Sequence, residues 1–254
     1  MIADTASDQR TVITGSSGIA AATAQVLAAC GHQVFILGID PDSCKALAQE
    51  VNQTHNWCAV DLREEEATRA AFTTAHKVMG GLTGLVAVAG GSGRSLGDGD
   101  ISDISLEAWN ATLALNLTPT FLAMSAALGV MQRGGSVVAV SSVLATDPQP
   151  DKFRTHAYAA AKGAINSLVK SVAAAYAIQG IRVNAVAPGL VETPMSSRAQ
   201  EDPKIQAFIK NKQPLSSGFL NANDVAQTIV QVLENPNITG QIITIDGGWS
   251  VIPS

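Results

Sequence analysis

The chain contains few cysteines, and its first residues predict no export. Its 254 residues include only Cys30, Cys44 and Cys58, whose odd number and wide spacing match neither a redox pair nor a zinc-binding pattern. The first ten residues carry two aspartates and lack the apolar stretch of a secretory signal. We therefore expect a protein of the reducing cytoplasm.

Long apolar runs and runs of basic residues are also missing. Leu85–Ala89 and Val137–Val140 are far shorter than the roughly 20 residues that cross a bilayer as a helix. The 16 basic and 21 acidic side chains give a net charge of −5, which offers no footprint for nucleic acid or an anionic membrane. Because 46% of the residues are apolar, the composition excludes a disordered or fibrous protein.

The dominant pattern is a short, β-branched apolar run followed by a longer segment rich in Ala and Leu. This alternation predicts parallel strands joined by crossover helices. Strands are expected at Thr11–Thr14, Gln33–Leu37, Trp57–Val60, Leu85–Ala89, Ser136–Val140, Arg182–Val186 and Gln241–Ile245. Helices are expected at Ala20–Ala29, Asp42–Val51, Glu64–Val78, Leu106–Met131, Ala157–Ala177 and Asn223–Glu234. No linker rich in Pro or Ser divides the chain, so we predict a single-domain, doubly wound, Rossmann-like α/β fold with about seven parallel strands and helices on both faces.

Three segments have no regular pattern: Gly90–Ile104, Leu144–Thr155 and Gly189–Phe219. Each follows a predicted strand, and the carboxyl ends of parallel strands line one crevice of an open α/β sheet. We expect these loops to contact cofactor and substrate, the alternative being plain solvated connections.

A glycine-containing turn follows the first predicted strand and opens the first helix. It reads Thr14-Gly15-Ser16-Ser17-Gly18-Ile19-Ala20. Backbone N–H groups at a helix start can bind a pyrophosphate, although glycine is also common in such turns for geometry alone. The turn lacks the GK[ST] sequence of a P-loop nucleotide triphosphatase.

A carboxylate near the end of the second strand indicates which dinucleotide would bind. Asp40 lies about 20 residues beyond the glycine loop, where a carboxylate can accept hydrogen bonds from the ribose hydroxyls of NAD. No Arg or Lys stands in the glycine loop or beside Gly38 to pair with a 2′-phosphate, so we favour NAD over NADP. Because Pro41 and Asp42 follow, Asp40 could instead cap a helix or a turn.

Tyr158 and Lys162 are the most informative pair in the sequence. Residues four apart on a helix share one face, and a nearby ammonium lowers the pKa of a tyrosine from about 10 toward the range of a useful base. Ser142 ends the apolar run of the preceding strand, where a hydroxyl can hydrogen-bond a substrate carbonyl. A YxxxK sequence alone is often surface decoration, and strand-terminal serines are often turn residues.

Other chemistries find little support. The four histidines form no HExxH sequence, no G-x-S-x-G elbow occurs, and we expect no metal site. Three of the histidines, His32, His55 and His76, are expected at the surface or in loops. His156 precedes Tyr158 by two residues and is a candidate for facing the substrate.

Taken together, these motifs resemble the short-chain dehydrogenase/reductase family over nearly the whole chain. The glycine loop resembles the family's TGxxxGxG motif with one residue fewer between its glycines, and Ala20 replaces the last glycine. Ala89-Gly90 resembles the end of the family's NNAG motif, whose asparagines are replaced by Ala87 and Val88, so we expect apolar packing there.

The resemblance implies an NAD(P)-dependent oxidoreductase that interconverts a secondary alcohol and a ketone by hydride transfer. Tyr158 would handle the proton and Ser142, preferred over Ser141, would polarise the oxygen. Lys162 would lower the tyrosine pKa and bind the nicotinamide ribose, while Asn116 in the preceding long helix would support a proton relay. The alternative role for Asn116 is structural, at a kink of the helix or in a hydrogen bond back to the helix backbone.

The resemblance also assigns cofactor contacts. Asp61-Leu62 resembles the family's adenine-binding pair, with a capping role for Asp61 as the alternative. Pro188–Thr193 resembles the PGxxxT element, in which the Val191 backbone and the Thr193 hydroxyl would hold the carboxamide. The full set of cofactor candidates is Gly15, Ser17, Gly18, Ile19, Asp40, Asp61, Leu62, Ala89, Gly90, Tyr158, Lys162, Pro188, Gly189, Val191 and Thr193.

Two other functions remain open. The shortened glycine loop and the replaced asparagines favour a non-catalytic protein that senses dinucleotides or acts as a scaffold. Within enzymes, the alternative is an NADPH-dependent reductase of 3-oxoacyl groups on a carrier protein. The segment Thr239–Gly248 resembles the family's last strand and turn, which packs between subunits, so a homodimer or homotetramer is expected.

Overall fold

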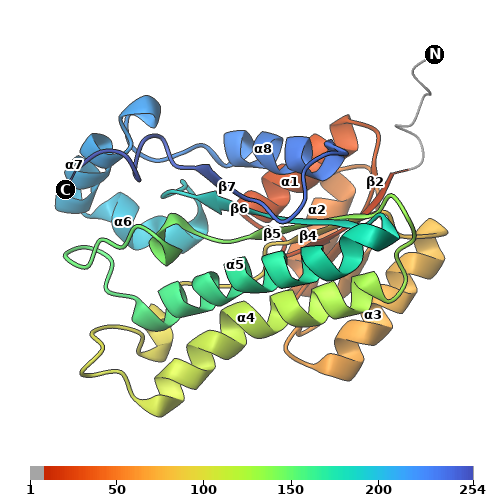
Figure 1. Cartoon of the computed structure of the whole chain (residues 1–254), viewed down its shortest axis with the longest axis horizontal. Helices are drawn as coiled ribbons and strands as arrows, with labels where there is room; N and C mark the ends of the chain where they lie inside the picture. Colours follow the sequence, from red (N-terminus) through yellow and green to blue (C-terminus); the bar gives the residue numbers. More distant parts are fainter. Residues whose placement is uncertain (1–8, 254) are drawn as a thin grey trace.

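The computed structural model describes residues 9–253, which form one seven-stranded parallel sheet with helices on both faces (Figure 1). The strands are β1 (Arg10–Thr14), β2 (Gln33–Gly38), β3 (Trp57–Ala59), β4 (Gly84–Ala87), β5 (Ser136–Val140), β6 (Arg182–Pro188) and β7 (Ile242–Ile245). The helices are α1 (Ile19–Ala29), α2 (Pro41–Glu50), α3 (Glu65–Met79), α4 (Leu106–Leu128), α5 (His156–Tyr176), α6 (Ser197–Glu201), α7 (Pro203–Lys212) and α8 (Ala222–Glu234). The predicted doubly wound α/β fold is confirmed.

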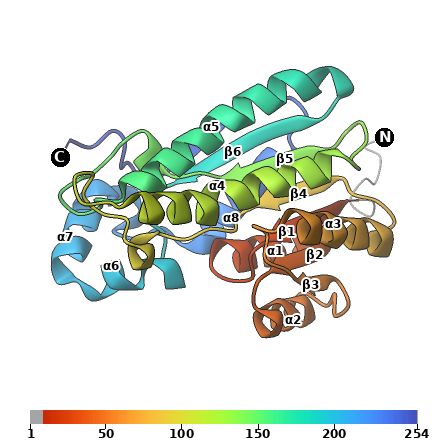
Figure 2. The same cartoon turned by 90° about the horizontal axis from the view of Figure 1, so that it is seen from below.

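Two apolar layers hold the helices to the sheet. Helices α3, α4 and α5 pack on one face of the sheet (Figure 2). The side chains buried between them and the strands include Phe72 and Ile165. Helices α1, α2 and α8 pack on the other face around Leu27, Leu47 and Ile229. The five inner strands, β1, β2, β4, β5 and β6, are buried on both faces, which is why they appear in the sequence as continuous apolar runs.

The strand order is β3-β2-β1-β4-β5-β6-β7. β1 pairs in parallel with both β2 and β4, so the chain winds outward in one direction from β1 and then in the other from β4. Ligands of open α/β sheets bind beyond the carboxyl ends of the strands at such a reversal. The fold therefore places the site next to the ends of β1 and β4.

Element boundaries differ little from those predicted, and one difference has a clear cause. β4 ends at Ala87 instead of Ala89, because the N–H groups of Val88 and Ala89 donate to the Thr14 hydroxyl at 2.9 and 3.1 Å. This side chain thus ties the end of β4 to the end of β1.

The prediction of an irregular Gly189–Phe219 segment is wrong, because it contains α6 and α7. Pro203 occupies the first turn of α7, and Asp202 caps it by accepting hydrogen bonds from the next backbone N–H groups. Ile205 and Ile209 lie on one face and are buried. A proline and an acidic cap mark a helix start as readily as a loop.

Helix α4 is long and apolar enough to cross a membrane by length and composition, with a mean hydropathy of 1.4 over its most apolar stretch. In the structure, 56% of that stretch is buried, and α4 packs against α5, α3 and β4. It serves as a core helix in this fold.

His32 lies in the loop before β2, one of the two expected places, but it is buried and not at the surface. The ring is 4% exposed, and its nitrogens lie 3.2 Å from the Thr11 hydroxyl and 3.1 Å from a Glu234 carboxylate oxygen. His32 therefore joins the start of β1 to the end of α8, a long-range contact without a local sequence signal.

Arg182 closes the carboxyl end of α8, and its replacement is expected to destabilise the protein. Its guanidinium donates to the carbonyls of Val232, Leu233 and Ile238. Arg182→Met leaves these carbonyls without their donor and should lower the free energy of unfolding by about 2 kcal/mol in urea denaturation. Arg133→Met removes a single exposed bond to the Ile178 carbonyl and is the control; equal losses in both variants would contradict this role.

Candidate active site

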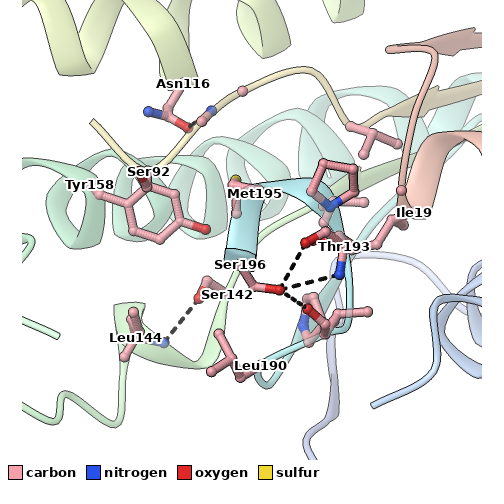
Figure 3. Close-up of a pocket in the computed structure, with 18 of the residues that line it drawn as sticks. Ile19, Ser92, Asn116, Ser142, Leu144, Tyr158, Leu190, Thr193, Met195 and Ser196 are labelled. Atoms are coloured by element: carbon pink, nitrogen blue, oxygen red, sulfur yellow. Dashed lines mark hydrogen bonds between the residues drawn. The ribbon is translucent and has the colours of Figure 1, made fainter. Parts of the chain in front are cut away.

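A cavity of about 450 Å³ lies beyond the carboxyl ends of the strands, at the reversal of strand order. One part is walled by the glycine loop, residues 15–20, and another by residues that follow β4, β5 and β6. Ser142, Tyr158, Lys162 and Asn116 all line it, so the structure brings the four predicted catalytic side chains together (Figure 3).

The glycine loop is shaped for close approach by a ligand. Gly15 has φ 99° and Gly18 has φ 55°, a region that favours glycine. Among the described residues, no side chain caps α1, and its first turn holds no acidic residue. The partial positive charge of this helix start is therefore available to a pyrophosphate. Gly18 also lies close to the segment after β6, because a Cβ at this position would be only 3.0 Å from the Thr193 methyl group.

Tyr158 and Lys162 lie one turn apart on α5, as predicted, and both are almost fully buried. The Lys162 ammonium is 5.6 Å from the centre of the Tyr158 ring and donates to the Val140 carbonyl at 2.8 Å. That carbonyl is the last of β5, so the lysine is fixed to the strand that leads to Ser142.

Burial controls the acidity of both groups. It raises the pKa of Tyr158 to about 12, against a smaller lowering by the hydrogen bond with Ser142. It also lowers the pKa of Lys162 to about 8. The expectation that Lys162 lowers the tyrosine pKa is thus corrected: the net shift is upward, because loss of water around the phenol outweighs the other influences.

The two serines after β5 have different surroundings. The Ser141 hydroxyl donates to the Lys162 carbonyl at 3.3 Å, which joins β5 to α5. The Ser142 hydroxyl accepts from the Leu144 N–H at 3.2 Å (Figure 3). Its interaction with the Tyr158 phenol lowers the pKa of that phenol. Ser142 is therefore the hydroxyl beside the phenol, as the sequence favoured.

Asn116 is fully buried and joins α4 to the loop after β4. Its amide nitrogen donates to the Thr112 carbonyl one turn back, and its amide oxygen accepts from the Gly91 N–H at 3.0 Å (Figure 3). A Cβ at Gly90 would lie 2.6 Å from that oxygen, so this loop can approach Asn116 only with glycine. The side chain both bonds back within its helix and shapes the cavity wall.

Ala87 and Val88, which replace the two asparagines of the NNAG motif, make the apolar contacts that were expected. Ala87 is buried in the core on one side of the sheet, and Val88 packs against the core on the other. Thr14, which holds the Val88 and Ala89 N–H groups, supplies the polar contact at this point. Ala89 and Gly90 line the cavity.

Beyond β6, the chain turns over the cavity. Pro188, Gly189, Val191 and Thr193 line it, as predicted. Val191 forms an isolated parallel bridge with Leu220. The hydrogen bonds of this bridge use the backbone on either side of Val191, the Leu190 carbonyl and the Glu192 N–H, so the Val191 N–H is not part of the bridge. Thr193 opens a short 3-10 helix, η5 (Pro194–Ser196), whose Ser196 hydroxyl donates to the Val191 carbonyl (Figure 3).

Gln213 holds this turn, and the sequence did not reveal it. The side chain is fully buried; its oxygen accepts from the Leu190 N–H at 2.6 Å and its nitrogen donates to the Leu190 and Gly218 carbonyls. A Cβ at Gly189 would lie 2.3 Å from the glutamine oxygen. A lone glutamine beyond α7 carries no sequence signal for this long-range role.

Asp98 is a second residue that the sequence analysis missed. Thr155 at the start of α5 makes no side-chain capping bond among the described residues. The buried Asp98 carboxylate caps the helix in place of Thr155, because it accepts from the Ala157 N–H at 3.0 Å and from the Tyr158 N–H at 2.9 Å. An uncapped helix start signals that a partner is needed but not which distant residue provides it.

Three predicted cofactor residues are not brought to the cavity. Asp40 is exposed and caps α2, accepting from the Asp42 N–H and the Ser43 hydroxyl, bonds that lower its pKa. Asp61 forms an ion pair with Arg63, which lowers the pKa of that carboxyl, and Leu62 is buried in the core. The helix-capping alternative for Asp40 is the arrangement observed.

Gly38, the last residue of β2, has no room for a side chain. A Cβ at Gly38 would lie 2.8 Å from the buried Cys44 sulfur. His156, which was expected as a candidate for facing the substrate, begins α5 and does not line the cavity.

Comparisons with known proteins agree with this geometry. A family model described as "Enoyl-(Acyl carrier protein) reductase" matches residues 13–250. "Inactive 2-(S)-hydroxypropyl-CoM dehydrogenase 2" from Xanthobacter autotrophicus is 34% identical over 87% of this chain and 96% of its own length. "3-oxoacyl-[acyl-carrier-protein] reductase" from Rattus norvegicus is 33% identical over 93% of this chain and 95% of its own length.

A solved structure gives the same result. The short chain dehydrogenase from Burkholderia cenocepacia in complex with NADP has a TM-score of 0.84 and 28% identity, covering 97% of this chain and 99% of that protein. The chain belongs to the short-chain dehydrogenase/reductase family. It is accordingly an oxidoreductase of an NAD(P)-dependent class.

Replacing Asp98 is expected to loosen the start of α5. Asp98→Asn keeps the shape but removes the negative charge and one of the two acceptors at the helix start, so the free energy of unfolding should fall by about 1–2 kcal/mol. Urea denaturation measures this loss, and hydrogen exchange at the Ala157 and Tyr158 amides should accelerate.

The control for this prediction is Asp103→Asn in the same loop, where the side chain is exposed. It should change stability by less than about 0.5 kcal/mol. If the Asp98 variant unfolds at the same denaturant concentration as wild type, the capping role is wrong.

Proposed function

We propose that the protein reduces a ketone to a secondary alcohol, or runs the reverse reaction, in a single NAD(P)-binding domain that carries both cofactor and substrate sites. The observation that carries this proposal is the convergence of Ser142, Tyr158, Lys162 and Asn116 on a cavity that begins at an uncapped helix start.

The residues suit a proton transfer next to a developing oxyanion. With a pKa of about 12, the Tyr158 phenol is protonated at neutral pH and can donate to the substrate oxygen as negative charge develops. Ser142, which lines the cavity with Tyr158 and interacts with its phenol, stabilises the same oxygen. The Lys162 ammonium stays close to the ring, and Asn116 supports the relay that returns a proton to Tyr158.

The bound nicotinamide supplies or accepts the hydride. The residues proposed to hold the dinucleotide are those of the glycine loop (Gly15, Ser17, Gly18 and Ile19), Ala89 and Gly90, and Pro188 to Thr193. In this proposal Lys162 also binds the nicotinamide ribose.

We infer that NAD is preferred, since no basic side chain lines the glycine-loop end of the cavity in the described chain. Asp40 supports this preference only if its carboxylate leaves the α2 cap. Two relatives motivate the alternative of an NADPH-dependent 3-oxoacyl reductase: one is named for that reaction, and the Burkholderia protein binds NADP.

A non-catalytic role is the second candidate. The first relative above is named as inactive, and the shortened glycine loop points the same way. Against it stands the burial of Lys162 beside Tyr158, an arrangement that costs free energy and that dinucleotide binding alone does not require.

Cofactor binding and the tyrosine test the proposal together. Titration with NADH and with NADPH, followed by nicotinamide fluorescence, should give saturable binding, tighter for NADH. Tyr158→Phe should bind cofactor as wild type does, but reduce ketones at least about a hundredfold more slowly, because it has no proton to donate.

The matched control is Tyr176→Phe, at the other end of α5, which should keep wild-type turnover. Wild-type rates in Tyr158→Phe would refute the proton-transfer role. Failure of both dinucleotides to bind would favour the scaffold alternative.

We further propose that the protein works in the cytoplasm as a homodimer or homotetramer. Exposed apolar side chains on the surface of α4 and near the carboxyl end, Phe121 and Val251, are candidates for the contact between copies. Light scattering should give a multiple of the 26.2 kDa chain mass; a monomer at micromolar concentration would contradict the assembly.

A further inference from the structure

Two arginines that the catalytic scheme does not use line the cavity together with Ser142 and Tyr158. Arg94 lies in a short 3-10 helix, η2 (Arg94–Leu96), after β4, and Arg198 lies in α6 after β6. Both segments line the side of the cavity that holds Phe153 and Trp249 as well. The glycine loop, where a dinucleotide phosphate would bind, is built from other residues of the same cavity.

The two guanidinium groups meet at one oxygen. Arg94 donates to the Lys152 carbonyl at 3.5 Å, and Arg198 donates to the same carbonyl at 3.2 Å. Two like charges are thus held close to each other by a neutral acceptor. Mutual repulsion with Arg198 adds to burial in lowering the pKa of Arg94.

Neither arginine forms an ion pair with a carboxylate within the part of the chain that the structure describes. Across residues 9–253, three other arginines, Arg63, Arg69 and Arg154, form ion pairs with acidic side chains, whereas Arg94 and Arg198 form none. Asp98 is the acidic group that acts on Arg94, but its two oxygens are already used by the start of α5. Arg94 is partly buried and is repelled by the exposed Arg198, and an anion bound to both guanidinium groups would offset the cost of both.

Apolar side chains line the cavity with the arginines and the catalytic groups. Leu144, Phe153, Met195 and Trp249 are among them. The Phe153 and Trp249 rings are 5.7 Å apart, and the Trp249 N–H is taken by the Asp147 carbonyl, so the indole offers the cavity a carbon surface. A ligand that reaches from Tyr158 to the arginines must therefore tolerate an apolar environment.

We propose that Arg94 and Arg198 form an anion subsite, and that the substrate is a ketone or secondary alcohol with an anionic group at the far end of a short apolar chain. The planar guanidinium groups can bind a carboxylate or a phosphate in a bidentate manner. This inference rests on the proposed function for the reacting carbon, whereas the anion subsite itself can be tested by binding alone.

The test compares ligands that differ only in charge. The pairs are 4-oxopentanoate, 5-oxohexanoate and 6-oxoheptanoate with their amides, and the corresponding 5-oxohexyl phosphate separates a carboxylate site from a phosphate site. For the best chain length, kcat/KM of the anion should exceed that of the amide by roughly ten- to a hundredfold, as expected for charge-assisted hydrogen bonds.

The variants are Arg94→Gln and Arg198→Gln, and the quantity measured is the ratio of kcat/KM between anion and amide. Each variant should reduce this ratio at least about tenfold. Arg198 is exposed, so its variant keeps the test valid if Arg94→Gln does not fold. The control is Arg154→Gln, an exposed arginine paired with Asp100, which should keep the wild-type ratio.

Calorimetric binding of the same ligands to the cofactor-saturated protein separates the two proposals. Tighter binding of the anion, lost in the arginine variants, supports the subsite even if no ketone is reduced, a result that would refute only the proposed function. Equal turnover or equal binding of anion and amide at every chain length overturns the subsite, as does absence of binding of both.

Discussion

The parallel pairing of β1 with both β2 and β4 is the constraint on which the rest of the structure depends. Because every strand runs in the same direction, every carboxyl end opens at the same edge of the sheet, and the reversal of order leaves a gap there. The glycine loop, the Asn116 contact, Ser142 and the turn after β6 all belong to this edge. Residues far apart in the sequence meet because the strands that carry them are neighbours.

The side chains proposed to carry out catalysis are held by contacts between elements more than by contacts within them. Lys162 donates to the end of β5, Ser141 donates to the lysine carbonyl, and Asp98 binds the start of α5 from the loop after β4. α5 is thereby fixed at both its first turn and its second, so the positions of Tyr158 and Lys162 are determined by two separate segments, the end of β5 and the loop after β4. Such support limits the conformational freedom of buried polar groups, which is what precise positioning requires.

Much of the fold could be predicted from the sequence because its signals are local. Apolar runs, helical spacing and the YxxxK pair depend on neighbouring residues, and the seven strands and the placement of Tyr158, Lys162, Ser142 and Asn116 in one cavity follow from them. The prediction that Asp40 lines the cofactor site failed because its local signal has two meanings. A carboxylate before Pro41 satisfies both a ribose-binding pattern and a helix cap, and only the path of the backbone decides between them.

Other features depend on contacts that no local pattern records. Gln213, Asp98 and His32 each bind groups that lie more than twenty residues away or on another element, and their own neighbours in the chain are unremarkable. The upward shift of the Tyr158 pKa is of the same kind, since it depends on how completely water is excluded. Burial is a property of the assembled layers.

The η2 loop has a consequence for how this enzyme can change over evolution or in the laboratory. It carries Arg94, which faces the cavity, and four residues later Asp98, which holds the start of the catalytic helix. A loop that only lined the cavity could be lengthened or exchanged freely to accept new compounds. Here, an insertion between these two residues would displace the backbone of Tyr158 as well. Changes that preserve activity are therefore expected in the side chain at position 94 and in the segment after β6, which Gln213 holds separately.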